Sequence, residues 1–149
     1  MKPKLFLLLP LFFLALLAAC APTATTPVKA EAGGVFPIKT TELWSVQFNI
    51  GSQVTRVDFS LNGAPNLDSD NWVYADFKTS TPYFGGTGAV PDDRKSLILL
   101  FNADQKGASQ FSCVVPMSAD LTTGAKGNGA QFLNDRKIGD FACSIGKIK

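Results

Sequence analysis

An all-β fold is what this sequence predicts: a single antiparallel β-sandwich or small β-barrel of about seven or eight strands. Beyond residue 36, apolar and polar residues alternate with a period of two, which is typical of strands with one buried face. No window of about 11 residues shows the apolar stripe of an amphipathic helix. The 13 glycines fall mostly between the alternating segments, where they favour turns.

The strands follow from these segments in order. We expect them at 44–50, 57–61, 73–77, 97–101, 111–115, 130–133 and 141–145. Gly51-Ser52, the segment 62–65 and the segment 134–137 supply turns between them. The run 97–101 is continuously apolar, which predicts a strand covered on both faces. No internal repeat or second domain is visible.

The first 20 residues have the pattern of an export signal. Lys2 and Lys4 precede an apolar run at 5–19, which is shorter than the roughly 20 residues that span a bilayer. Leu17-Ala18-Ala19-Cys20, directly after that run, resembles the lipobox of bacterial lipoproteins. The resemblance covers residues 2–20 alone, and the rest of the chain resembles no family by its motifs.

That resemblance implies cleavage before Cys20 and attachment of a diacylglycerol and a fatty acid to this residue. The protein is then exported and anchored by lipid to the cell membrane or, if the host has one, to the outer membrane. Ala21 favours the outer membrane because aspartate at this position favours inner-membrane retention. The alternative is ordinary secretion, in which Cys20 is an incidental thiol.

The expected organisation is a signal peptide at 1–19, a lipidated cysteine and flexible tether at 20–34, and one β-domain at 35–149. The tether is rich in Pro, Thr, Ala and Gly and has too few apolar residues to fold. Once Lys2 and Lys4 are removed with the signal, the chain is formally neutral. A neutral domain has no electrostatic basis for binding nucleic acid, so we expect membrane attachment through the lipid alone.

Cys113 and Cys143 lie in matching surroundings, each two residues after a Phe and two before a β-branched residue. With Cys20 acylated, these are the two thiols that remain in an oxidising compartment, which predicts a structural disulfide between them. The competing interpretation is a reactive or metal-binding pair. The chain has neither a CxxC spacing nor any histidine to support it.

The absence of histidine excludes Ser-His-Asp and Cys-His catalysis and His-based zinc sites. We therefore predict no catalytic residues and no cofactor beyond the lipid. Asn66, Asp68 and Asp70 are weak candidates for calcium ligands, because oxygen side chains recur at alternate positions. A turn held by side-chain to backbone hydrogen bonds is the simpler explanation.

Four aromatic residues form the candidate binding patch: Trp72, Tyr74, Tyr83 and Phe84. Trp72 and Tyr74 alternate with apolar residues and should point outward, and Tyr83-Phe84 lie in the glycine-rich segment 81–88, which we expect to be a mobile loop. Alternatively, Trp72 and Tyr74 fill half of the core of a closed sandwich while the loop with Tyr83 and Phe84 folds over an open end. The favoured function is a non-catalytic envelope lipoprotein that binds a protein, peptide or glycan. A small aspartate-based hydrolase, a calcium-binding domain and a purely structural envelope protein stay open.

Overall fold

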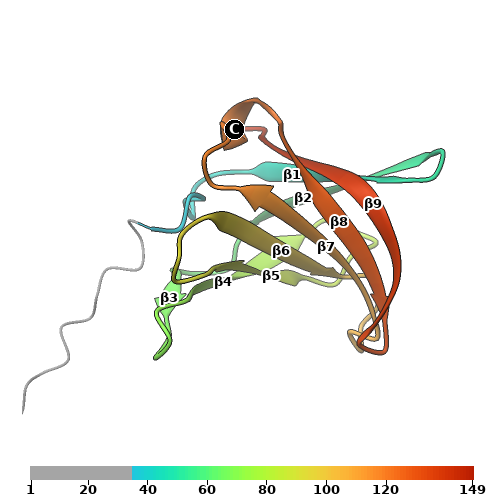
Figure 1. The fold of residues 1–149 in the computed structure, drawn as a ribbon, viewed down its shortest axis with the longest axis horizontal. Helices are drawn as coiled ribbons and strands as arrows, with labels where there is room; N and C mark the ends of the chain where they lie inside the picture. Colours follow the sequence, from blue (N-terminus) through green and yellow to red (C-terminus); the bar gives the residue numbers. More distant parts are fainter. Residues whose placement is uncertain (1–34) are drawn as a thin grey trace, which may run out of the picture.

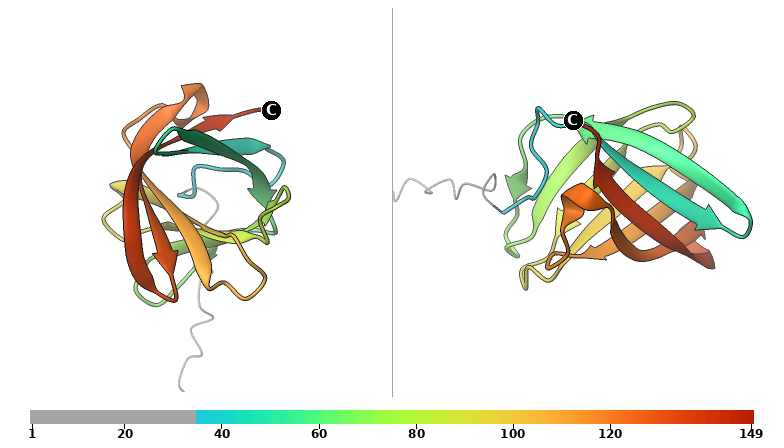
Figure 2. Two further views of the ribbon diagram at one scale, coloured as in Figure 1. Left: turned by 90° about the vertical axis from the view of Figure 1, so that its right-hand side faces the viewer. Right: turned by 90° about the horizontal axis from the view of Figure 1, so that it is seen from above.

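Nine antiparallel strands form one sheet that closes on itself in the computed structural model, which describes residues 35–149 (Figure 1). The order is β2-β1-β9-β8-β7-β6-β5-β4-β3, and a further pairing of β2 with β4 closes the ring. Figure 2 shows these strands arranged around a common interior. The all-β prediction is confirmed. The strands are β1 (Trp44–Ile50), β2 (Gln53–Leu61), β3 (Asn66–Leu67), β4 (Val73–Thr79), β5 (Gly86–Val90), β6 (Ser96–Asn102), β7 (Ser109–Pro116), β8 (Ala125–Leu133) and β9 (Arg136–Lys147).

Inward rows of alternating residues make the core. Phe48, Phe59 and Phe101 are fully buried, and the Phe101 ring packs edge to face against Phe48 at 5.8 Å and against Phe59 at 5.3 Å between centroids. Phe36 and Ile38, which precede β1, are buried in the same core. The segment before β1 therefore contributes to the packing of the core.

The expected turns lie between these strands. Ile50 pairs with Gln53 across Gly51-Ser52, so the first hairpin has a two-residue turn. Asn134 and Asp135 adopt the left-handed conformation between β8 and β9, and β2 ends at Leu61, as predicted. A short 3₁₀ helix, η2 (Leu121–Thr123), is capped by the Asp120 side chain, which accepts a hydrogen bond from the Thr122 backbone N–H.

Strand β5 corrects the last part of the predicted loop at 81–88, because residues 86–88 belong to the strand. Gly86 and Gly88 belong to this strand, and their lack of a side chain serves close packing. A methyl group at Gly88 would overlap the rings of Phe77 and Phe36, and one at Gly86 would overlap the Leu100 carbonyl. Glycine is needed here because neighbouring groups occupy the space of a Cβ atom.

Strand β6 corrects a second expectation. Leu97, Leu99 and Phe101 are completely buried, but Ile98 and Leu100 are only half-buried. A closed ring has one interior, so alternate residues of this strand face outward even though all of them are apolar. The two outward residues, Ile98 and Leu100, belong to the outer surface described in the next subsection.

Candidate functional site

Four apolar side chains form a row across the outer face of β4 to β7. Tyr74 lies opposite Ala89, and Ala89 lies opposite Ile98. Ile98 in turn lies opposite Val114. Residues opposite each other in a ladder have Cβ atoms about 5 Å apart on the same face of the sheet. We call these four residues the outer row; Tyr74 and Val114 at its ends are each 37% exposed, whereas Ile98 is half-buried and Ala89 is only 8% exposed.

A shallow depression of about 360 Å³ continues the outer row onto β8. Val114 belongs to both, and Asn128 lies opposite it on β8. Two exposed lysines, Lys95 and Lys126, give the depression its positive charge. The Nζ of Lys95 is 3.9 Å from the Asp93 carboxylate, and the side chains of Lys95 and Asp93 both face solvent. The lining residues are Lys95, Ser96, Val114, Pro116, Lys126, Gly127 and Asn128. The combined surface offers apolar contact beside two cationic groups.

The predicted aromatic patch is only partly assembled. Trp72 and Tyr74 point outward as expected, with ring centroids 6.0 Å apart and planes inclined by 18°. Phe84 is 51% exposed, but Tyr83 is only 8% exposed and packs against Phe111 in the core. Burial raises the pKa of Tyr83. The structure thus places Tyr83 in the core, which corrects its assignment to the outward patch, because its ring packs against Phe111.

Two of the three calcium candidates, Asp68 and Asp70, lie in a turn. One Asp68 carboxylate oxygen accepts hydrogen bonds from the backbone N–H groups of Asp70 at 3.0 Å and Trp72 at 2.8 Å. This is the side-chain to backbone pattern that stabilises Asx turns. Asn66 lies in β3, opposite Tyr74. Within residues 35–149, no three His, Cys, Asp or Glu side chains gather as a metal site.

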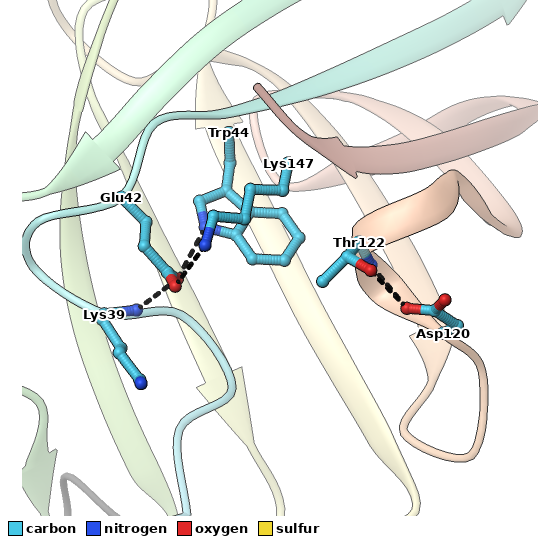
Figure 3. Close-up of polar contacts among 6 residues, drawn as sticks. All are labelled: Lys39, Glu42, Trp44, Asp120, Thr122 and Lys147. Carbon is cyan, nitrogen blue, oxygen red and sulfur yellow. Dashed lines mark hydrogen bonds and ion pairs between the residues drawn. The ribbon is translucent and has the colours of Figure 1, made fainter. Parts of the chain in front are cut away.

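The Glu42 carboxylate lies among several hydrogen-bond donors just before the start of β1 (Figure 3). Its carboxylate accepts hydrogen bonds from Lys147 Nζ at 2.8 Å, Trp44 Nε1 at 3.1 Å and the Lys39 backbone N–H at 3.0 Å. Burial alone would raise the pKa of Glu42, but these hydrogen bonds outweigh it and lower the pKa from 4.5 to about 2. The contact joins the segment before β1 to the end of β9. We interpret it as structural, because its acceptors are already engaged.

Two other carboxylates hold turns in the same way. Asp104 accepts hydrogen bonds from the backbone of Ser109, Ala108 and Lys106, which lower its pKa against the effect of desolvation. Hydrogen bonds from the hydroxyl and backbone N–H of Thr122 lower the pKa of Asp120. These shifts therefore have local structural causes.

Cys113 and Cys143 form the predicted disulfide, with Cα atoms 5.9 Å apart. The bridge joins β7 to β9, which lie on either side of β8, and both cysteines are buried. Opposite them on β8 stand Gly129 and Gly127, respectively. These glycines carry no inward side chain, so the bridge can pass across β8 inside the ring.

Cys20 lies outside the described residues, so its lipidation stays a prediction. Of the helices within 35–149, none has the length and apolar character needed to cross a membrane. Comparison of the chain with family models, curated proteins and solved structures gives no match.

Sequence reasoning missed the outer row beyond Tyr74 and the two lysines beside it. The sequence predicts a doubly covered strand at Ile98, and its pattern does not single out Lys95 or Lys126. The available signal was the surplus of apolar residues in 97–101. In a single closed sheet, such a run must expose every second side chain.

Proposed function

We propose that this protein is an exported lipoprotein whose β-domain is a non-catalytic module that binds an envelope protein. Acyl chains at Cys20 anchor it to the cell membrane, or to the outer membrane where the host has one. The lipobox resemblance supports the anchor, and the outer row with its adjoining lysines supports the binding role. This outer surface is the observation that carries the proposal.

The outer row is suited to contact with protein. Surface apolar groups gathered in one place favour an interaction site, whereas isolated ones are ordinary. Tyr74 and Trp72 supply large rings of the kind enriched at the centres of protein interfaces. Leu100 lies opposite Thr87 on the same outer face and adds a second outward apolar residue of β6 beside Ile98.

Charge specifies the partner further. Lys95 and Lys126 line the depression at the Val114 end of the outer row. A docking segment with apolar side chains beside an aspartate or glutamate would satisfy both parts of this surface. We therefore propose a protein partner that presents such a segment.

In-cell photo-crosslinking tests this proposal. A photoreactive amino acid at position 114 of the full-length protein should give a crosslink to one protein, mapped by mass spectrometry to an apolar segment next to a carboxylate. Position 138 is the matched control, because Ile138 is 55% exposed in the β8–β9 hairpin, away from the outer row. Equal crosslinking from both positions, or crosslinks from position 114 to lipid or glycan, would overturn the protein-binding role.

A further inference from the structure

One edge of β2 has no partner strand over its first half within residues 35–149. β2 pairs with β1 from Gln53 to Phe59, but its ladder with β4 begins only at Phe59. One more contact follows, in which the Ser80 backbone N–H donates to the Asp58 carbonyl at 2.8 Å. The chain then turns away, so the β1–β2 hairpin projects beyond the neighbouring strands (Figure 1).

The unpaired backbone groups can be assigned by alternation. Asp58 directs its backbone groups to the β4 side, because its carbonyl accepts from Ser80 N–H and its N–H donates to Ser80 Oγ at 3.2 Å. In a strand, residues two and four positions away point the same way. The N–H and C=O groups of Val54 and Arg56 therefore form the free edge.

The side chains beside this edge differ in character. Val54 is 65% exposed on the outer face. The Arg56 side chain is paired with Asp58 at 2.7 Å. A free edge with an exposed apolar residue is a template for another strand.

We propose that a second copy of this chain occupies the edge, with the two β2 strands antiparallel across a two-fold axis at Val54. A strand edge of this kind is self-complementary, because the same residue offers both a donor and an acceptor. The two Val54 residues exchange N–H···O=C hydrogen bonds and bring their exposed side chains together.

The surroundings select this register. An axis at Arg56 would set two guanidinium groups opposite each other and place the second Val54 where Ser80 already bonds to Asp58. An axis at Thr55 would place Ser52 of the second copy opposite Asp58, at the position that Ser80 already occupies. An axis at Val54 leaves the position of Ser80 free, because the second hairpin turns back at Gly51-Ser52 before reaching it.

This contact buries less surface than the interfaces that hold stable dimers in solution. The inferred dimer therefore rests on the proposed lipid anchor, which confines copies of the chain to one membrane surface and raises their effective concentration. The inference predicts dimers on the membrane.

Cysteine crosslinking of the full-length protein in its own membrane tests the pairing. Opposite residues in a hydrogen-bonded antiparallel pair have Cα atoms about 5.5 Å apart, within reach of a disulfide. Val54→Cys should give at least about fivefold more disulfide-linked dimer on mild oxidation than the exposed control Ile138→Cys. Equal yields from the two variants, or linkage of Val54→Cys to a different protein, would overturn the second-copy pairing.

Acyl-chain labelling of the same samples separates the two proposals. Labelled protein without the Val54→Cys dimer refutes the edge pairing and leaves the anchor standing. Unlabelled protein that still dimerises at this position refutes the anchor and shows that the edge pairing forms without it. Loss of both refutes both.

Discussion

Glu42→Gln should make the stability of the domain less dependent on pH in the acid range. Glutamine keeps an oxygen that can accept from Trp44 Nε1 and the Lys39 backbone, but it removes the negative charge beside Lys147. Comparing wild type with Glu42→Gln therefore isolates the contribution of the carboxylate's negative charge to stability, which the surrounding hydrogen-bond donors favour.

The size of the effect follows from the pKa of Glu42, which falls from 4.5 to about 2 on folding. Each unit of pKa shift corresponds to about 1.4 kcal/mol, so the charge stabilises the fold by at most about 3 kcal/mol. Because the folded pKa is the lower one, this stabilisation is fully present above pH 4.5 and is lost as the pH falls toward 2.

Urea unfolding between pH 7 and pH 2 measures the difference. The wild-type protein should be more stable than Glu42→Gln at neutral pH, and the gap should close below pH 4.5. Asp140→Asn is the matched control, because Asp140 pairs with Lys137 at an exposed site and should change stability little. A gap between wild type and Glu42→Gln that stays constant down to pH 2 would refute the reasoning.

Three further outcomes are expected. Cys143→Ser should cost about 3.5 kcal/mol of unfolding free energy, as the chain-entropy model gives for a sequence separation of 30, and an unchanged urea midpoint would contradict it. Gly129→Ala should destabilise by roughly 1 to 3 kcal/mol, because the added methyl group would overlap the Phe141 ring, whereas Gly139→Ala, with open space around it, should have a small effect in the same assay. Cys20→Ser should abolish acyl-chain labelling and lipoprotein signal-peptide cleavage, and a normally labelled and processed variant would disprove the lipobox interpretation.

The strands with mixed inner and outer faces were predictable from the sequence because their pattern is local. In β1 and β4, for example, inward Val46 and Ala75 alternate with outward Gln47 and Asp76. A residue pattern of this kind identifies a strand before anything is known of its neighbours. Strand β5 was missed because its glycines look like a loop; the Phe36 and Phe77 rings explain Gly88, and the Leu100 carbonyl explains Gly86.

The candidate site depended on long-range arrangement, which the sequence conveys poorly. The disulfide partners were predictable from composition, but the passage of the bridge across β8 was not, since it depends on the glycines of a third strand. Likewise, Tyr83 and Phe84 are adjacent in sequence, yet the Tyr83 side chain is buried in the core and the Phe84 side chain is exposed to solvent. The outer row appears only when the registers of four strands are known.

The affinity of the domain for the protein that crosslinks at position 114 tests the central claim most directly. Titrations should compare wild type, the double variant Lys95→Glu/Lys126→Glu and the matched control Lys106→Glu, an exposed lysine in the loop between β6 and β7. We predict that the double variant weakens binding about tenfold or more, that added salt weakens wild-type binding, and that Lys106→Glu leaves the affinity unchanged. Equal affinities for all three proteins would contradict a binding site on the outer face of β4 to β8.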